Sequence, residues 1–234
     1  MKIGIFLINL DERKDRLESS TQKMKEAGLE FTRIPAISYS EVEKSMFLTA
    51  PVLACWKSHL KTYSTLIASD FDYALVLEDD FSIYNPKKFG NFLTHLDLEK
   101  YDLLQLGFLL PGFLNRLRWL YEELEKLLFS TLGLLSISIG LKSLTGRLRV
   151  AEARSASVKF TQSSFFPGTH AYLISREMAL ALTNLDSSQL SADEFFIALS
   201  KMRSFRMSRF WRSLITQNNS APSINNRFLK QNKI

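Results

Sequence analysis

The stretch Tyr73-Ala-Leu-Val-Leu-Glu-Asp-Asp-Phe81 joins a short apolar run to three consecutive carboxylates, Glu78, Asp79 and Asp80. The run lacks helical spacing and has Val and Leu at both odd and even positions, which is typical of a strand covered on both faces. Three adjacent carboxylates repel one another unless they share a cation, and Mg²⁺ and Mn²⁺ prefer such oxygen ligands. The pattern predicts a buried strand that ends in a metal site, with a solvated acidic turn as the alternative.

Length and composition predict a folded chain with one domain. The 234 residues are 46% hydrophobic, enough for a full core and too many for a disordered chain. The single cysteine, Cys55, excludes an internal disulfide, and with three histidines it is too few for a structural zinc site of the usual kind. The same cysteine usage favours a reducing, cytoplasmic setting. The apolar run at residues 3–8 has no small-residue cleavage site, so we expect a first strand and no secretory signal.

Basic residues gather toward the C-terminus. The formal net charge is +6, and no acid follows Glu194. The basic residues beyond that point are Lys201, Arg203, Arg206, Arg209, Arg212, Arg227, Lys230 and Lys233. We expect this basic C-terminal tail to be attracted to phosphates or to an anionic membrane surface. Nucleic acid is not expected, because the tail has neither a helix-turn-helix pattern nor aromatic RNA-binding motifs.

Strand and helix patterns alternate through the first 107 residues. The expected strands are 3–10, 29–34, 73–78 and 101–107, and the expected helices are one that Asp11 caps and Gly28 ends, one over 51–69 and one that opens at Pro86. This alternation predicts an α/β sheet with helices on its faces and right-handed crossovers.

Polar side chains cluster where the predicted strands end. Arg13 and Arg16 follow the first strand, at the sheet edge where α/β proteins bind ligands, so they are candidates to bind a diphosphate. A solvated helix face is the alternative. His59 shares a helix side with Cys55 and, with Ser58, is expected to face the same site. The alternative for His59 is a buried histidine that only satisfies a hydrogen bond.

The regular pattern stops between residues 108 and 160. The uncharged stretch 127–141 is shorter than the roughly 20 apolar residues that a membrane helix needs. We expect a helical insertion that forms a lid or a membrane-surface element, with an ordinary buried helix and loop as the alternative.

A second acidic point follows when the pattern resumes. Residues 166–175 predict a turn and a strand that contains His170, and residues 176–185 predict a helix. Ser191 is placed to cap another helix, with Asp193 in its first turn and Glu194 at the capping-box position. Residues 217–226 are polar and rich in Asn, and we expect them to form an exposed tail.

Seven short motifs, taken in order, resemble glycosyltransferase family 25, whose members extend bacterial lipopolysaccharide or lipooligosaccharide cores. They are Ile8-Asn-Leu-Asp-Glu-Arg-Lys-Asp-Arg16, Ile34-Pro-Ala-Ile37, Ala54-Cys-Trp-Lys-Ser-His59, Leu75-Val-Leu-Glu-Asp-Asp80, Tyr101-Asp-Leu-Leu104, Gly168-Thr-His-Ala-Tyr-Leu-Ile-Ser175 and Ala192-Asp-Glu-Phe195. The resemblance covers residues 2–196, apart from 108–160. Trp56-Lys57 departs from the family's pattern.

The resemblance implies a GT-A-like nucleotide-sugar-binding fold, a mixed and mostly parallel sheet flanked by helices. Residues 1–107 would form the nucleotide-sugar half, 108–160 the insertion, and 161–234 the acceptor half with the basic tail. The implied reaction moves a hexose, usually galactose from UDP-galactose, onto a lipid-linked saccharide with inversion, using Mn²⁺ or Mg²⁺. The enzyme would sit peripherally on the inner face of the cell membrane.

Residue roles follow from the same resemblance. Asp80 would bind the metal, and Glu78 would bind the metal or the donor ribose. The remaining implied donor contacts are Asn9, Arg13, Arg16, Ser58, His59 and Asp79.

Glycosyl transfer also needs a base for the acceptor hydroxyl, on the face opposite the leaving group. Asp193 is the candidate, and Glu194 is second because its side chain can be occupied in the cap. His170 is expected to bind the metal or the acceptor, with a buried structural histidine as the alternative.

Two other classes of function remain open at this point. One is a non-catalytic basic module that binds a membrane surface or nucleic acid, with the acidic triplet as a turn. The other is a metal-dependent phosphohydrolase that uses the same triplet.

Overall fold

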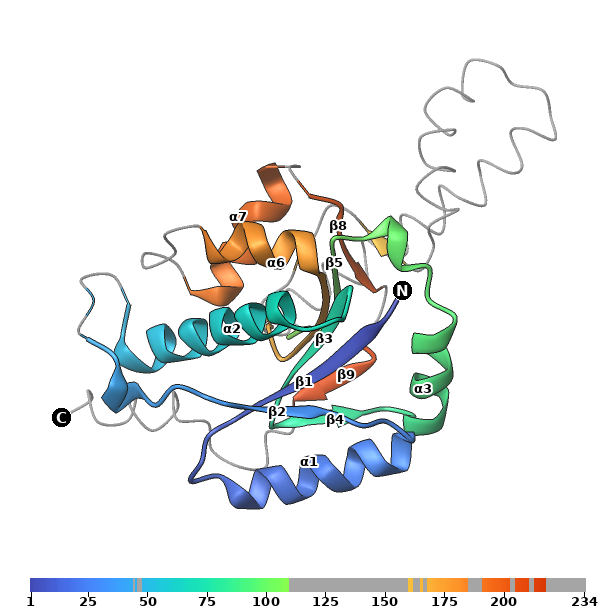
Figure 1. The fold of residues 1–234 in the computed structure, drawn as a ribbon, viewed down its shortest axis with the longest axis horizontal. Coiled ribbons are helices and arrows are strands. Elements are labelled where there is room, and N and C mark those ends of the chain that lie inside the picture. The colour runs from blue at the N-terminus through green and yellow to red at the C-terminus, as the bar shows by residue number, and fades with distance from the viewer. Residues whose placement is uncertain are drawn as a thin grey trace, which may run out of the picture. The chain divides into compact units, whose positions relative to one another are not determined.

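The computed structural model shows an α/β fold with helices on both faces of a central sheet (Figure 1). It describes residues 1–43, 45, 48–109, 160–161, 165, 168–184, 191–202, 205–210 and 213–217. The chain divides into two compact units, Met1–Leu109 with Gln162–Ile234, and Leu110–Thr161. The insertion expected at 108–160 lies almost wholly outside the described residues, so the following account concerns the first unit.

The central sheet is mixed and mostly parallel. Its strands in the first unit, in spatial order, are β2 (Thr32–Pro35), β1 (Ile3–Asn9), β3 (Tyr73–Glu78), β7 (Ala171–Ser175), β5 (Leu103–Gly107) and β8 (Met207–Phe210). Strand β1 pairs in parallel with β2 and β3, β5 pairs in parallel with β8, and β7 is antiparallel to both β3 and β5. The predicted α/β class is confirmed.

Three shorter strands complete the strands of the described chain. Strand β4 (Phe81–Ile83) pairs antiparallel with β9 (Ile215–Gln217), and β6 (Phe160–Thr161) belongs to the second unit. Strand β4 begins directly after the acidic triplet. The chain therefore turns sharply at Asp79 and Asp80 and enters a second sheet.

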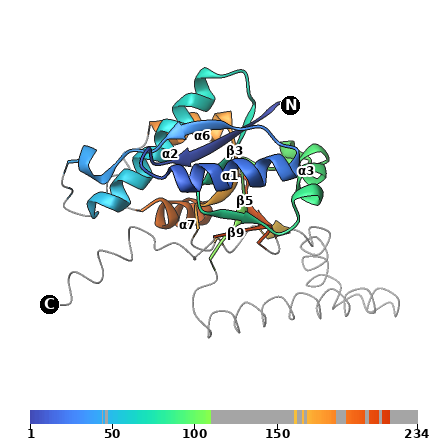
Figure 2. The ribbon, with the colours of Figure 1, turned by 90° about the horizontal axis from the view of Figure 1, so that it is seen from below.

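Helices cover both faces of the sheet. They are α1 (Lys14–Ala27), α2 (Ala50–Ala68), α3 (Pro86–Thr94), α6 (Arg176–Thr183) and α7 (Ala192–Met202), with short 3₁₀ turns η1 (Tyr39–Glu41) and η2 (Leu98–Lys100). Figures 1 and 2 show α2, α6 and α7 together on one side and α1 with α3 on the other. Among these helices, none is long and apolar enough to cross a membrane.

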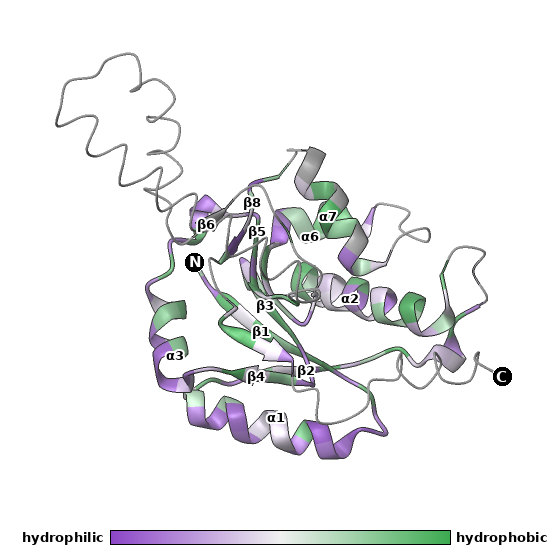
Figure 3. Ribbon diagram, turned by 180° about the vertical axis from the view of Figure 1, so that it is seen from behind, coloured by the Kyte–Doolittle hydropathy of each residue, from purple (hydrophilic) through white to green (hydrophobic). Residues whose placement is uncertain are grey.

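Apolar residues face the sheet as the sequence pattern predicts. Leu53, Trp56, Tyr63 and Leu66 of α2 are all buried, at the helical spacing expected for residues 51–69. Figure 3 shows the contrast between α1, which is mostly hydrophilic, and the hydrophobic central strands. The core therefore lies chiefly between the sheet and the α2, α6 and α7 layer.

The start of α1 differs from the prediction. The helix begins at Lys14, and Arg13 at its N-cap makes no side-chain cap bond. Asp11, expected to cap it, instead accepts a hydrogen bond from Arg33 of β2. An arginine brought close by the parallel pairing of β1 and β2 competes for the Asp11 carboxylate.

Two of the basic residues that follow Glu194 are bound within the fold. Arg209 is fully buried, with its guanidinium 5.3 Å from the ring centre of Phe108. Arg206 binds both oxygens of Asp102, at 3.2 and 2.6 Å. Gln217, expected to start the tail, lies in β9. The edge of β5 and the Asp102 carboxylate hold this segment, and residues 218–234 lie outside the described residues.

The end of α1 at Gly28 offers a test of the fold. Gly28 has φ = 67°, the left-handed conformation that disfavours a Cβ, and its N–H bonds the Lys25 carbonyl. We expect Gly28→Ala to lower the free energy of unfolding by about 1 kcal/mol, measured by urea denaturation. Gly28→Asn is the matched control and should cost less, because Asn adopts this conformation more readily. Equal losses for the two variants would contradict this explanation.

Candidate active site

Three parallel strands end at the same edge of the sheet, and their ends form one side of a crevice. Ile8 of β1 pairs with Glu78 of β3, and Asn9 pairs with Pro35 of β2. From β1 the chain passes through α1 to β2 on one side, then through α2 to β3 on the other. In α/β sheets, ligands bind at such a switch in strand order.

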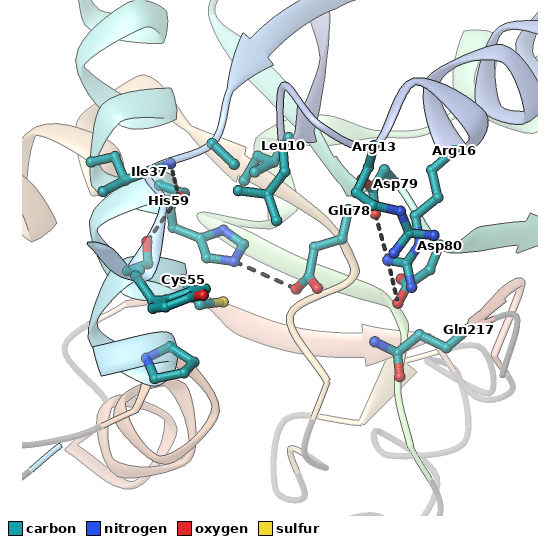
Figure 4. Close-up of a pocket in the computed structure, with 16 residues that line it drawn as sticks. Leu10, Arg13, Arg16, Ile37, Cys55, His59, Glu78, Asp79, Asp80 and Gln217 are labelled. Atoms are coloured by element: carbon teal, nitrogen blue, oxygen red, sulfur yellow. Dashed lines mark hydrogen bonds and ion pairs between the residues drawn. The ribbon is translucent and has the colours of Figure 1, made fainter. Parts of the chain in front are cut away.

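A cavity of about 190 Å³ lies at this edge (Figure 4). It is lined by Ile8, Leu10, Arg13, Arg16, Ala36, Ile37, Tyr39, Pro51, Ala54, Cys55, Ser58, His59, Glu78, Asp79, Asp80 and Gln217. Seven of the residues named from the sequence are thus brought together at this cavity. Asn9, His170 and Asp193 are not among its lining residues.

The side chains of the three acids point in two directions. The Glu78 carboxylate lies toward His59, with Oε1 3.5 Å from Nε2, and accepts a hydrogen bond from Thr169 Oγ1 at 2.9 Å. Asp79 and Asp80 lie on the other side of Figure 4, beside Arg16. Strand β3 ends at Glu78 and the chain turns at Asp79 and Asp80, so the triplet serves two parts of the cavity.

Asp79 is held by three groups from β1 and α1. Its Oδ2 accepts from Asn9 Nδ2 at 2.8 Å and its Oδ1 from Arg16 Nη1 at 2.8 Å, while Ser20 Oγ donates to its carbonyl at 3.2 Å. Asn9 is itself buried, and its Oδ1 accepts from Arg33. The geometry thus shows Asn9 positioning Asp79, and its expected contact with a donor stays a prediction.

Asp80 has unsatisfied bonding capacity. Its Oδ2 lies 3.5 Å from Arg16 Nη1, and its buried Oδ1 has no hydrogen-bond partner among the described residues. Burial and the Glu78 charge raise the pKa of Asp80 from 3.8 to about 7, although Arg16 acts to lower it. Arg16 Nε is likewise buried without such a partner. The two groups retain capacity to bind a ligand.

Arg13 lies at the start of α1 on the rim of the cavity. Asp15 accepts two hydrogen bonds from it, at 2.9 and 2.8 Å. This pair raises the pKa of Arg13, and it lowers the pKa of the exposed Asp15 to about 2. The guanidinium is therefore held in place while it borders the cavity.

His59 belongs to a buried chain of polar groups. Its Nδ1 lies 2.8 Å from the hydroxyl of Tyr172, which lies 2.7 Å from the hydroxyl of Tyr63. Although burial acts to raise the pKa of Glu78, His59, His170 and the hydrogen bond from Thr169 together lower it. Ser58 beside it donates to the Ala54 carbonyl and accepts from the Ile37 N–H, which joins α2 to the loop after β2.

Asp193 and His170 approach the site from the second half of the chain. Asp193 Oδ1 accepts from the Gly168 N–H at 2.9 Å, and burial raises the pKa of its carboxyl group. His170 is fully buried, donates from Nε2 to the Ile215 carbonyl at 3.1 Å, and has its pKa lowered by burial. The backbone of Glu194 lies in α7, but the structure does not describe its side chain.

Several contacting residues escaped the sequence analysis. Thr169, Tyr172 and Gln217 come from β9 or from the segment around β7, far in sequence from the cavity's other walls. Thr169 and Tyr172 fall within a family motif, which was the available signal. The thiol of Cys55 also lines the cavity, and burial raises its pKa, so it is a neutral thiol at pH 7.

The residues present fit a divalent cation of the kind that the resemblance implies. Asp80 offers a buried, unpartnered oxygen, and the nearby Glu78 charge raises its pKa. A cation would satisfy that oxygen and relieve the repulsion between the two carboxylates. Asp79 is already occupied by Asn9 and Arg16, so it is less suited to such a role.

A mixed α/β sheet with a polar crevice at its switch point is typical of enzymes that bind nucleotides. The sequence matches the model of glycosyltransferase family 25 (LPS biosynthesis protein) over residues 2–196. The chain belongs to this family, which confirms the resemblance inferred from its motifs.

Two further proteins are similar to this chain. Procollagen galactosyltransferase 1-B of Xenopus laevis is 25% identical over 126 residues, which take in 44% of this chain and 21% of that protein. The chain thus spans about a fifth of that relative's length. The crystal structure of A197 from STIV matches with a TM-score of 0.43 and 11% identity, covering 92% of this chain and 83% of the other.

Asp79 is predicted to stabilise the fold more than an exposed acid does. Asp79→Ala leaves Asn9 and Arg16 without their buried partner, and we expect it to lower the free energy of unfolding by about 3 kcal/mol in urea denaturation. Asp15→Ala is the matched control, because it breaks an exposed Asp–Arg pair and should change stability little. Similar losses in both variants would contradict the inferred role.

Asp80 should make stability depend on pH. Its folded pKa of about 7 exceeds the ordinary 3.8, so the folded state holds the proton more tightly. The resulting stabilisation is complete below pH 4 and is lost as pH rises to about 7, by up to about 4 kcal/mol. We expect Asp80→Asn to match the native chain at pH 4 and to be more stable at pH 8. Parallel pH profiles from urea denaturation would refute this expectation.

Proposed function

We propose that this chain is an inverting, metal-dependent hexosyltransferase with a GT-A-like fold. It would transfer galactose from UDP-galactose to a lipid-linked saccharide of the lipopolysaccharide core type. The observation that carries the proposal is the pairing of Glu78 and the unsatisfied Asp80 with Arg13 and Arg16, at the switch point of the sheet. Family membership supports the transferase chemistry, and the galactosyltransferase relative supports the choice of sugar.

The donor diphosphate is proposed to lie between α1 and the end of β3. Arg13 borders this space, and Arg16 has a buried Nε without a hydrogen-bond partner among the described residues. Guanidinium groups bind phosphate oxygens through two parallel hydrogen bonds. The first turn of α1 adds the positive end of a helix dipole, which favours the same anion.

Asp80 and Glu78 are proposed to hold Mn²⁺ or Mg²⁺, which when bound would neutralise charge on the departing diphosphate. The role of the protein is to position these two carboxylates. Asp79 fixes the turn, Thr169 holds Glu78 through its hydroxyl, and Arg16 balances part of the charge on Asp80. Charges fixed in advance in this way stabilise a transition state without reorganisation.

Asp193 is proposed as the base that removes the proton from the acceptor hydroxyl. Burial raises the pKa of its carboxyl group, which brings it nearer the operating pH, and the Gly168 N–H fixes one of its oxygens. It comes from α7, a different element from the strand that carries Glu78, so it could lie on the face of the sugar opposite the leaving group, which inversion requires. Glu194 stays the second candidate.

A location on the inner face of the membrane is also part of the proposal. It rests on a lipid-linked acceptor and on the basic residues after 217, which lie outside the described residues. The alternatives of a basic binding module and of a phosphohydrolase gain no specific support from the described residues.

The metal assignment predicts loss of activity in Asp80→Ala. We expect transfer from UDP-galactose to fall at least about a hundredfold, and UDP with Mn²⁺ to stop raising the melting temperature. Asp97→Ala is the control, since this carboxylate is exposed and pairs with Lys100 on η2. Full activity in Asp80→Ala or in excess chelator would refute the metal role.

The base assignment predicts a different pattern in Asp193→Asn. Transfer should fall by about 10²- to 10⁴-fold, while UDP with Mn²⁺ still stabilises the variant, because donor binding is retained. Retained transfer would exclude Asp193 as the base, and loss of UDP stabilisation would indicate a structural role instead.

A further inference from the structure

Three side chains of different chemistry meet at the side of the cavity away from Asp80. Cys55 Sγ, a ring nitrogen of His59 and a carboxylate oxygen of Glu78 all lie within 4.8 Å of one another. Figure 4 shows the first two side chains on α2 and the third at the end of β3, directed toward a common point. Within the described part of the chain, no other group of three such side chains meets this spacing.

His59 supplies independent evidence that something binds there. The residue is fully buried, and its Nε2 has no hydrogen-bond partner among the described residues. The nearby Glu78 Oε1, at 3.5 Å, is too far for a good hydrogen bond. A buried polar atom without a partner is costly, and a ligand at this point would satisfy it.

The ring of His59 is oriented as a metal ligand requires. Its Nδ1 is hydrogen-bonded to the Tyr172 hydroxyl at 2.8 Å, which turns Nε2 toward Glu78. Metal-binding histidines generally have their second nitrogen bonded in this way, which fixes the ring orientation. Tyr63 bonds Tyr172 at 2.7 Å and extends the support.

We propose that Cys55, His59 and Glu78 form a site for a borderline-soft divalent cation such as Zn²⁺, separate from the Asp80 site. Thiolate and imidazole ligands favour Zn²⁺ or Co²⁺, whereas Mg²⁺ and Mn²⁺ prefer oxygen ligands. On binding, the thiol proton leaves to solvent and the sulfur donates to the cation. Three protein ligands leave a fourth position open toward the cavity.

The site is accessible from solvent through the cavity. Cys55 and Glu78 both line it, and the Glu78 side chain is 23% exposed. Glu78 is also a proposed ligand of the Mn²⁺ or Mg²⁺ site, so the two cations would compete for one carboxylate. This competition rests on the proposed function, but zinc binding itself does not.

Cobalt titration of the untagged full chain tests the proposal directly. Cys55 is the chain's single cysteine, so a sulfur-to-cobalt charge-transfer band can arise from this residue alone. We expect such a band to saturate at one Co²⁺ per chain and to disappear when Zn²⁺ is added. If the native protein gives no such band, the proposal is overturned, and this result does not depend on any variant.

Variants then assign the ligands. Cys55→Ser should abolish the band and weaken zinc binding more than about a hundredfold, because loss of a hydrogen bond to a ligand alone costs about 10- to 100-fold. Tyr172→Phe should keep the band and lose affinity within that smaller range. Zinc affinity equal in the native chain and in Cys55→Ser would refute the site.

Two controls separate this site from others. His95→Ala removes an exposed histidine on the C-terminal side of α3 and should leave zinc binding and the cobalt band unchanged. Asp80→Asn should also retain both, because Asp80 is not a ligand of this site. Loss of the band in His95→Ala would place the metal elsewhere and overturn the proposal. The binding readout is independent of transferase activity, so either proposal can fail alone.

Discussion

The buried carboxylate of Asp79 holds together the elements that form the cavity. Asn9 at the end of β1 and Arg16 in α1 donate to its two oxygens, and Ser20 of α1 donates to its carbonyl. These bonds fix the turn between β3 and β4. Because Asp79 uses these donors, its neighbours Glu78 and Asp80 are left to face the cavity on either side. The close placement of the Glu78 and Asp80 charges at this edge therefore depends on the Asp79 carboxylate, whose two oxygens are both hydrogen-bonded.

The cavity has two chemically different ends with Glu78 between them. At one end Asp80 offers oxygen ligands and two arginines offer hydrogen-bond donors to phosphate. At the other end His59 offers a nitrogen ligand and Cys55 a sulfur ligand. Hard and borderline-soft cations differ in the ligands that they prefer. A single carboxylate shared by both ends couples them, so occupancy of one end changes the charge that the other end meets.

The antiparallel strand β7 brings the second half of the chain to this edge. Thr169 and Tyr172 reach Glu78 and His59 because β7 pairs with β3, with Leu77 opposite Ala171. The same segment is joined to β9 by the hydrogen bond from His170 to the Ile215 carbonyl. Gly107 allows this packing, since a Cβ there would lie 2.4 Å from the His170 ring. The walls of the cavity thus come from both halves of the sequence.

The α/β class, the burial of α2 and the family can all be predicted from the amino-acid sequence. Local periodicity carries that information, and ordered motifs such as Leu75–Asp80 carry the family. The sequence also marked seven of the sixteen residues that line the cavity, several of them because parallel strands end at one edge.

The direction in which each side chain points, and the partner that it binds, depend on the folded structure. It paired Asp11 with Arg33 instead of the helix end, and it placed Arg209 in the core and Gln217 at the cavity. It also divided the acidic triplet between Arg16 and His59. These partners lie far apart in sequence, and they come within bonding distance only when the strands pair and the helices pack on the sheet.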